Sequence, residues 1–431
     1  MQKKIENWLK SQESLISFVE SFLSLDMGNS QLCLVGGVVR DILLGRTDGK
    51  DLDLMIDNCK ESQLQNWLKS LKSSEALSSF QKVGKSFPVY ILKIPGIEEH
   101  VDLSLARRER STGSGHTDFE IEAEDVSSKE DGERRDFTVN AIFLRFFLED
   151  AKVSCELMDH FSGLADLSVK KLRTVGDPLE RMKEDPLRIL RALRFVHQRG
   201  FSMDSMLQLI IEDNAANLIP HLSPDRIQDE FVRTMMANPQ EANRNYLRFD
   251  LYQTCFPKLA VYLPQKAEEI FPNEPLEHRD YVTPLLLMPY LEMHHFNLTS
   301  AQLKEIEDQV REAHLPNPKQ VKQILEGLCT LKARESTNYP MALQEKILEG
   351  PNGDYIHWFY VLYQRQGMMA PLPEYPAKPE RLDGHEIMSW GFQPGPGFEA
   401  IALRTRELQL QGTTDKEQLK RKILFESAML G

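Results

Sequence analysis

The most constraining feature of this sequence is the stretch 34–57, LVGGVVRDILLGRTDGKDLDLMID. An apolar run turns through Gly36 and Gly37, continues into an amphipathic segment, crosses a polar loop and ends in DLDLMID. Glycines at the start of a helix let backbone N–H groups approach an anion, which the helix N-terminus also favours. The stretch therefore predicts strand, turn, helix, loop and strand, with a phosphate-binding turn at Gly36 and Gly37.

Two aspartates in the second predicted strand are candidate metal ligands. Asp51 and Asp53 are two residues apart, so on a strand their side chains point to the same face. Paired carboxylates can hold Mg²⁺ ions that bridge a triphosphate and an attacking oxygen, although a solvated strand edge would give the same pattern. Arg40, one turn into the predicted helix, could add a forked phosphate contact or simply pair with Asp41 at the surface.

Composition limits the class of protein. With 431 residues the chain suggests about two to four domains. Its five cysteines form no CxxC pair, and no apolar run is long enough to span a bilayer, so we expect a cytoplasmic protein with reduced thiols and no membrane partner. The net charge of −13 argues against indiscriminate nucleic-acid binding, DNA included, but allows a local basic groove.

Periodicity predicts an α+β fold. Helices are expected over 1–27 and 60–75, and strands over 83–94 and 98–109. The polar segment 107–133 is longer than a compact domain usually leaves without structure, so it is predicted to be disordered or a working loop. Residues 134–147 are expected to be a strand or a buried helix, and most of the remainder has helical periodicity. We expect four regions: an α/β head at 1–150, a helical neck at 151–225, a helical body at 226–370 and a helical tail at 371–431.

Further candidate residues lie in the next predicted strands. Asp102 alternates with apolar neighbours in HVDLSLA, so it could join the aspartate pair as a metal ligand or proton acceptor, or stand on an exposed strand face. The segment RRDFTVNA carries Arg135, Asp136 and Asn140. These side chains could bind a triphosphate and a ribose, or form a charged strand entrance.

A charged face is predicted on the helix that begins near Pro186. Its members fall at three- and four-residue spacing and can share one face: Glu184, Asp185, Arg188, Arg191 and Arg194. A solvated stripe is the alternative. Cytosine and adenine both present an amine beside a ring nitrogen, so Asp185 accepting from the amine and Arg188 donating to the nitrogen could select C or A.

In this order, the motifs GGVVRD, DLDLMID, RRDFTVNA, DHFSGLADL, EDPLRILRALRF and SPDRIQDEF resemble the class II tRNA nucleotidyltransferases. These are the CCA-adding enzymes and bacterial poly(A) polymerases of the DNA polymerase β superfamily. The resemblance covers residues 32–240 and returns at 383–401, whereas 241–370 match only in being helical. It implies a polymerase β-like head with a mixed sheet and flanking helices, followed by an all-helical neck, body and tail.

The resemblance also implies residue roles. Asp51 and Asp53 would bind Mg²⁺, while the nucleotide would contact Gly37, Arg40 and Arg135, with Asp136 and Asn140 near its ribose. The charged helix would supply the protein template and phosphate contacts, and SPDRIQDE would buttress that helix through Arg226 and Glu230. Residues 107–133 match the flexible loop that helps the switch from C to A addition. Asp159, Gly163 and Asp166 match the hinge between head and neck.

The expected function is addition of CCA to tRNA 3′ ends from CTP and ATP, with the helical body gripping the acceptor and TψC arm. A CC-only enzyme, an A-only enzyme and a poly(A) polymerase remain alternatives, and a non-catalytic RNA-binding protein is the alternative of another class. Gly132 departs from the family, which commonly has leucine there. The sequence contains no His-Asp dipeptide, so we predict no second hydrolase activity.

Overall fold

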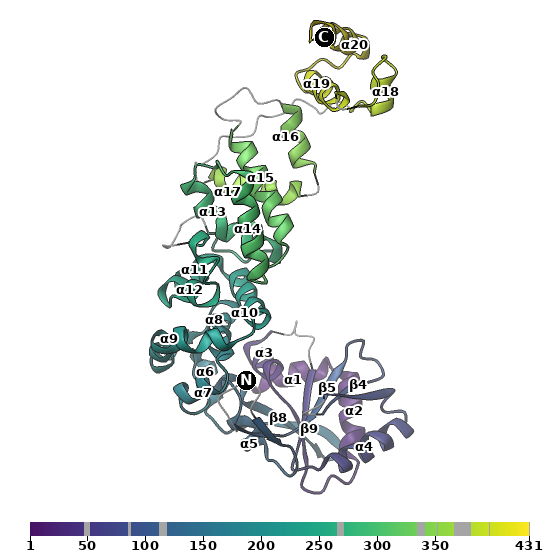
Figure 1. Cartoon of the computed structure of the whole chain (residues 1–431). Helices are drawn as coiled ribbons and strands as arrows, with labels where there is room; N and C mark the ends of the chain where they lie inside the picture. The colour runs from purple at the N-terminus through teal and green to yellow at the C-terminus, as the bar shows by residue number, and fades with distance from the viewer. Residues whose placement is uncertain are drawn as a thin grey trace. The chain divides into compact units, whose positions relative to one another are not determined.

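The computed structural model of the chain describes residues 1–46, 52–84, 88–111, 119–264, 271–333, 341–350, 352–365, 381–395 and 397–430. The chain divides into two compact units, Met1–Thr234 and Met235–Gly431 (Figure 1). The first unit contains all the strands that the structure describes, and the second is helical. Each unit is considered separately below.

A seven-stranded mixed sheet forms the centre of the first unit, in the order β3-β4-β5-β2-β1-β8-β9. The strands are β1 (Gln31–Leu34), β2 (Leu52–Asp57), β3 (Ser79–Val83), β4 (Val89–Lys93), β5 (Val101–Leu105), β8 (Ile142–Glu149) and β9 (Lys152–Asp159). β2 and β5 are parallel, whereas the other neighbouring strands are antiparallel. The predicted strand DLDLMID is confirmed from Leu52 onward, and Asp51 lies outside the described residues.

Four helices of the first unit pack beside this sheet (Figure 1). They are α1 (Gln2–Lys10), α2 (Glu13–Leu23), α3 (Gly37–Leu44) and α4 (Glu61–Ser73). The predicted helix over 1–27 is therefore two helices. In α4 the buried residues Leu64, Leu68 and Leu71 recur at helical spacing, which explains why this segment forms an amphipathic helix.

The polar segment 107–133 is structured over much of its length, so the disordered alternative is wrong there, while the working-loop alternative stays a prediction. It contains β6 (Arg108–Ser111) paired with β7 (Phe119–Glu122), and then α5 (Ser128–Glu133). Residues 112–118 lie outside the described part. Ser127 and Glu130 form a capping box at α5, and Arg108 pairs with Glu122 and Glu130. Hydrogen bonds from the Ser127 backbone and Arg108 lower the pKa of Glu130 to about 2. Charge pairing, which apolar periodicity does not reveal, stabilises this segment.

After the hairpin the chain returns to the sheet and then becomes helical. A 3₁₀ turn, η1 (Thr138–Asn140), precedes β8, and β9 extends the sheet beyond residue 150, where we placed the head boundary. The elements that follow are α6 (Gly163–Ser168), β10 (Lys171–Leu172), α7 (Pro178–Glu184), α8 (Leu187–Arg199), β11 (Ser202–Met203), α9 (Ser205–Leu218), η2 (Ile219–His221) and α10 (Pro224–Ala237). The division into head, neck, body and tail stays a prediction.

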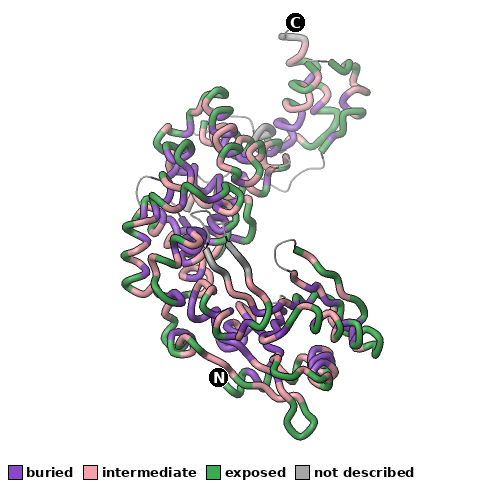
Figure 2. Tube along the Cα trace, turned by 60° about the horizontal axis from the view of Figure 1, so that its bottom comes forward, coloured by how far each residue is buried: buried purple, intermediate pink, exposed green. Residues whose placement is uncertain are grey.

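The second unit is built from helices whose buried and exposed residues alternate (Figure 2). After α10 they are α11 (Pro239–Arg248), α12 (Leu251–Cys255), α13 (Val282–Met293), α14 (Ser300–Glu312), α15 (Pro318–Ala333), α16 (Met341–Leu348), α17 (Gly353–Arg365), α18 (Gly384–Met388), α19 (Phe398–Leu410) and α20 (Lys416–Leu430). A buried ion pair between Glu345 and Arg406, with atoms 2.6 Å apart, joins α16 to α19. Within the described ranges, no helix combines the length and the apolar character needed to cross a membrane.

Gly163, at the start of α6, is predicted to tolerate no side chain. A Cβ atom there would lie 2.2 Å from the backbone oxygen of Thr138, in the turn that carries Asn140. We expect Gly163→Ala to lower the free energy of unfolding by about 1–3 kcal/mol, as overpacked sites do. Gly395→Ala is the matched control, because no heavy atom lies within 4 Å of the added carbon. Equal denaturation midpoints for the two variants would contradict this account of α6 packing.

Candidate active site

The glycine turn between β1 and α3 forms one wall of the site. Gly36 precedes α3 with φ of 76°, a conformation that glycine adopts without strain. A Cβ atom on Gly36 would lie 3.6 Å from both an Asp53 oxygen and the Nη1 atom of Arg135. The backbone at the start of α3 therefore lies close to both a carboxylate and a guanidinium. The turn predicted between strand and helix is present, and its binding of phosphate stays a prediction.

Asp53 and Asp102 lie side by side on neighbouring strands. They are register partners in the parallel pair β2–β5, so their side chains project from the same face. Asp53 is half-buried and Asp102 exposed, while Leu54 and Leu103 next to them are buried. The two aspartates line a cavity of about 320 Å³ together with Arg107. The structure thus brings the third predicted carboxylate, Asp102, beside Asp53.

The chemistry of this corner suits a hard divalent cation, because carboxylate oxygens are its preferred ligands. Asp51, the other predicted ligand, lies outside the described residues. Among the residues that are described, no group of three or more His, Cys, Asp or Glu side chains is arranged to hold a metal ion. The described part therefore contributes Asp53 and Asp102 to a potential metal site.

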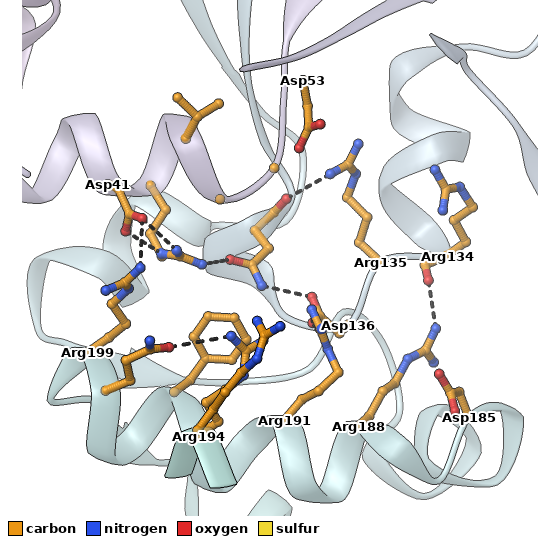
Figure 3. A pocket seen from close by; sticks show the side chains of 18 of the residues that line it. Asp41, Asp53, Arg134, Arg135, Asp136, Asp185, Arg188, Arg191, Arg194 and Arg199 are labelled. Carbon is orange, nitrogen blue, oxygen red and sulfur yellow. Dashed lines mark hydrogen bonds and ion pairs between the residues drawn. The ribbon is translucent and has the colours of Figure 1, made fainter. Parts of the chain in front are cut away.

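A larger cavity of about 710 Å³ opens next to this corner and extends to α8 (Figure 3). Nine arginines and four aspartates line it, an excess of five formal positive charges. The charged lining residues are Arg40, Asp41, Asp53, Arg107, Arg134, Arg135, Asp136, Asp185, Arg188, Arg191, Arg194, Arg199 and Arg233. In Figure 3, Asp53 and Arg135 approach from one side and the arginines of α8 from the other. Such a cavity suits a polyanion of about four charges, since arginine binds phosphate oxygens in a forked geometry.

Arg40 forms part of the cavity wall and is buried, with 4% of its surface exposed. Its Nε and Nη2 atoms each donate to Asp41 at 2.9 Å, and Nη1 donates to Asn140 at 2.6 Å. The guanidinium also lies 4.9 Å from the centre of the Phe195 ring. The proposed pairing of Arg40 with Asp41 is therefore present, but it is buried instead of lying on the surface. Arg40 lines the cavity chiefly as a structural link between α3 and η1.

Asp136 is the hub of the polar network. One oxygen accepts from the Phe137 backbone at 2.8 Å and from Asn140 at 2.9 Å, and the other accepts from Arg191 at 2.9 and 2.7 Å. These four bonds fill the lone-pair positions of a carboxylate. Burial raises the pKa of Asp136, but Arg191 and the hydrogen bonds outweigh burial and the net shift is downward. In this arrangement Asp136 orients Arg191, and a ribose contact would require an exchange of partners.

Four of the five residues predicted on the charged helix lie in the cavity wall, and their contact with a nucleotide stays a prediction. Asp185, Arg188, Arg191 and Arg194 line the cavity, whereas Glu184 is not among its lining residues. Glu184 instead accepts from Arg188 at 2.9 Å. Since α8 begins at Leu187, Asp185 precedes it, and its carboxylate accepts the Leu187 N–H at 3.2 Å.

The predicted buttress behind α8 is also confirmed. Arg226 donates to both oxygens of Asp185 at 3.2 and 3.1 Å. Glu230 lies 2.6 Å from Arg194 and 3.6 Å from Arg191. Burial lowers the pKa of Arg194, and Glu230 opposes that shift. Both residues of α10 therefore fix side chains that face the cavity.

Several cavity residues were missed from the sequence. They are Val38, Asp41, Arg107, Arg134, Phe195, Gln198, Arg199 and Arg233. Extending the three- and four-residue series of α8 beyond Arg194 would have found Gln198. Arg199 pairs with Asp41 at 3.1 Å, a contact between residues 158 positions apart that no local pattern reveals.

Part of the sequence matches a known protein family and curated proteins. Residues 32–173 match the poly(A) polymerase head domain. The Multifunctional CCA protein of Xanthomonas euvesicatoria pv. vesicatoria is 34% identical over 246 residues, which are 55% of this chain and 54% of that protein. The chain thus spans about half the length of the curated relatives it matches. These findings confirm the resemblance drawn from the motifs.

Solved structures extend the likeness to the whole chain. A CCA-adding enzyme in an apo form has a TM-score of 0.70 at 20% identity, covering 99% of this chain and 98% of the other. The Thermotoga maritima CCA-adding enzyme complexed with tRNA has a TM-score of 0.63 at 20% identity, covering 96% and 94%. Identities this low show the fold alone. The predicted fold class, a mixed-sheet head followed by helices, is confirmed.

The Asp136–Arg191 ion pair is predicted to stabilise the first unit, and the effects of substituting its two residues are predicted to be coupled. The Asp136 side chain is 10% exposed and that of Arg191 is 32% exposed. We expect Asp136→Asn to cost roughly 2–3 kcal/mol of unfolding free energy, because it removes the nearest countercharge of a partly buried guanidinium and leaves only Glu230, 3.6 Å away. In a double-mutant cycle measured by chemical denaturation, Asp136→Asn should lower the unfolding free energy much less when Arg191→Gln is already present. Additive losses would contradict the assigned coupling.

Proposed function

We propose that this chain, whose residues 32–173 belong to the poly(A) polymerase head domain family and which has the fold of the CCA-adding enzymes, is an RNA nucleotidyltransferase that adds CCA to tRNA 3′ ends from CTP and ATP. One observation carries the proposal. A single cavity joins the Asp53 carboxylate to the charged face of α8, with an excess of positive charge between them. A nucleoside triphosphate has its phosphates and its base at opposite ends, and the cavity offers matching groups at each end.

The phosphates would lie among the arginines near the glycine turn. Arg135 and the start of α3 face this region from two sides. Guanidinium groups and helix N-terminal N–H groups both bind phosphate oxygens and would stabilise the charge that develops on departing pyrophosphate. This arrangement orients the α-phosphate toward the aspartate corner.

The reaction would take place at the aspartate corner. Asp51 and Asp53 would hold Mg²⁺, which supplies Lewis acidity at the phosphate oxygens when bound. Asp102, exposed beside Asp53, would accept the proton of an attacking 3′-hydroxyl. The RNA oxygen then forms a bond to the α-phosphorus as the bond to pyrophosphate breaks.

Base selection would depend on Asp185 and Arg188. Arg188 is 8% exposed, and its Nη1 and Nη2 atoms donate to the carbonyl oxygens of Arg181 at 2.9 Å and Arg134 at 2.7 Å. Held in this way, it would donate to a ring nitrogen while Asp185 accepts from an exocyclic amine. Cytosine and adenine satisfy both groups, whereas uracil and guanine present a carbonyl and an N–H and would be rejected.

The helical second unit would bind the acceptor and TψC arm, a partner that the likeness to the tRNA-bound Thermotoga maritima enzyme supports. Proteins grip A-form RNA mainly through backbone charge and shape. CC-only addition, A-only addition and poly(A) synthesis use the same cavity chemistry and remain the alternative activities. A non-catalytic RNA-binding role is disfavoured because Asp53 and Asp102 are both in place.

A single assay distinguishes these activities. The full chain would be incubated with tRNA lacking CCA, tRNA lacking only the terminal A, and a generic RNA, each with one labelled nucleotide at a time. Sequential incorporation of C, C and A into the first RNA supports the proposal. Incorporation that stops after CC, occurs only on the second RNA, or continues as poly(A) on any RNA would identify the corresponding alternative. Absence of incorporation with intact tRNA binding would favour the non-catalytic role.

Asp53→Asn is predicted to abolish both CMP and AMP incorporation, because it removes a carboxylate charge from the metal corner. Binding of tRNA, measured by filter retention, should survive. Asp102→Asn is the matched comparison on the neighbouring strand and should slow incorporation without abolishing it. Normal rates of CCA addition by Asp53→Asn would refute the metal assignment.

Asp185→Asn is predicted to relax base selection. The amide can donate as well as accept, so it can also pair with the carbonyl of uracil. The ratio of kcat/KM for UTP to kcat/KM for CTP should therefore rise by roughly 5- to 100-fold, the discrimination that one good base contact provides. Glu180→Gln is the control, since Glu180 pairs with Lys183 on the exposed surface of α7 and neither residue lines the cavity. Unchanged selectivity in Asp185→Asn would place base recognition elsewhere.

A further inference from the structure

Asp131 is a fully buried carboxylate behind the arginine-lined cavity. It lies in α5, is 0% exposed and is not among the lining residues. Arg134 donates to its Oδ1 atom through Nε at 2.9 Å and Nη2 at 2.7 Å. Arg135 donates to Oδ2 through Nε at 3.0 Å and Nη2 at 2.8 Å. One carboxylate thus holds two arginines that line the cavity.

We infer that Asp131 is a positioning residue that aims Arg134 and Arg135 at the triphosphate without touching it. This inference rests on the proposed function. Each arginine gives the same edge, Nε and Nη2, to Asp131, so the Nη1 end of each points away from that carboxylate. For Arg135 that end lies at the glycine turn, where it donates to the Asn140 backbone at 3.2 Å and would be 3.6 Å from a Cβ on Gly36.

Electrostatics explains why a buried acid is needed here. Adjacent guanidinium groups repel one another, and their side chains are only 19% and 14% exposed, so water screens them poorly. A carboxylate between them offsets that repulsion and fixes both planes. Burial alone raises the pKa of Asp131, but Arg135 and Arg134 outweigh it and the net shift is downward, so the carboxylate stays charged.

Asp131 also reaches the start of the hairpin. Its Oδ1 atom accepts the backbone N–H of Arg107 at 3.2 Å, and Arg107 lines both cavities. The next residue, Arg108, pairs with Glu130, the neighbour of Asp131 in α5. The base of the hairpin and the two arginines therefore share one anchor. Removing that anchor should disturb phosphate binding more than base recognition or chemistry.

The test compares Asp131→Asn with Asp57→Asn. Asp57 is also buried, at 2% exposure, and accepts the Ser128 backbone N–H at the other end of α5, but it is outside the cavity lining. If Asp131 acted only by stabilising α5, both variants would behave alike. The readouts on the full chain are binding of inorganic pyrophosphate by calorimetry, KM and kcat for CTP and ATP, and thermal unfolding.

We expect Asp131→Asn to weaken pyrophosphate binding and raise both KM values by roughly tenfold or more, with a smaller change in kcat, as the loss of charge-assisted bonds implies. Asp57→Asn should lower the unfolding temperature while leaving pyrophosphate affinity unchanged. Wild-type affinity in a folded Asp131→Asn variant, or an equal loss in Asp57→Asn, would overturn the inference.

If Asp131→Asn does not fold, Asp131→Glu replaces it. The glutamate keeps the charge but displaces both guanidinium groups by about one carbon–carbon bond, so pyrophosphate affinity should still fall; unchanged affinity would overturn the inference. These outcomes are separable from failure of the proposed function, which is judged by nucleotide incorporation. A wild-type chain that binds no pyrophosphate refutes the positioning role, and one that binds it without incorporating nucleotides refutes the proposed activity alone.

Discussion

The Asp136 carboxylate, held by Arg191 on one side and Asn140 on the other, is the interaction on which the rest of the site depends. Asn140 accepts from Arg40, which is fixed in turn by Asp41 in α3. A continuous chain of hydrogen bonds therefore runs from the glycine turn to α8, although these elements are about 150 residues apart in sequence. Breaking this chain at Asp136 would leave charged groups unpaired on both sides, and such losses are costly in a poorly hydrated interior.

The same constraint governs the cavity as a whole. Nine arginines cannot be brought together without countercharges, because the self-repulsion and desolvation of guanidinium groups oppose folding. The structure places acids behind the arginines and leaves the cavity side positive. Asp131 holds Arg134 and Arg135, and Glu230 holds Arg194. Folding thus forms a positively charged cavity before any ligand binds, which is the electrostatic preorganisation that the proposed phosphoryl transfer would use.

Sequence reasoning recovered the parts of this site that local chemistry specifies. The glycine turn, the strand carrying Asp53 and the charged face of α8 each have a short-range signature, and the order of the motifs identified the fold. The partners of Asp131 and Arg199, and the contact of Arg40 with Asn140, could not be predicted, because they depend on which elements tertiary packing brings together. The hairpin after β5 was missed for a related reason: paired charges stabilise it, and those carry no apolar period.

The hydrogen-bonding capacity left on α8 bears on how a protein can select a base without a nucleic-acid template. A guanidinium has five N–H donors, and Arg188 gives three of them to Arg181, Glu184 and Arg134 within the described part of the chain. Asp185 accepts from Leu187 and twice from Arg226, so about one of its four lone-pair positions stays available. One acceptor and a small number of donors match the amine and ring nitrogen of cytosine or adenine. The contacts that hold Asp185 and Arg188 thus also limit which base they can bind. A side chain with fewer fixed partners could pair with more bases and would discriminate less between them.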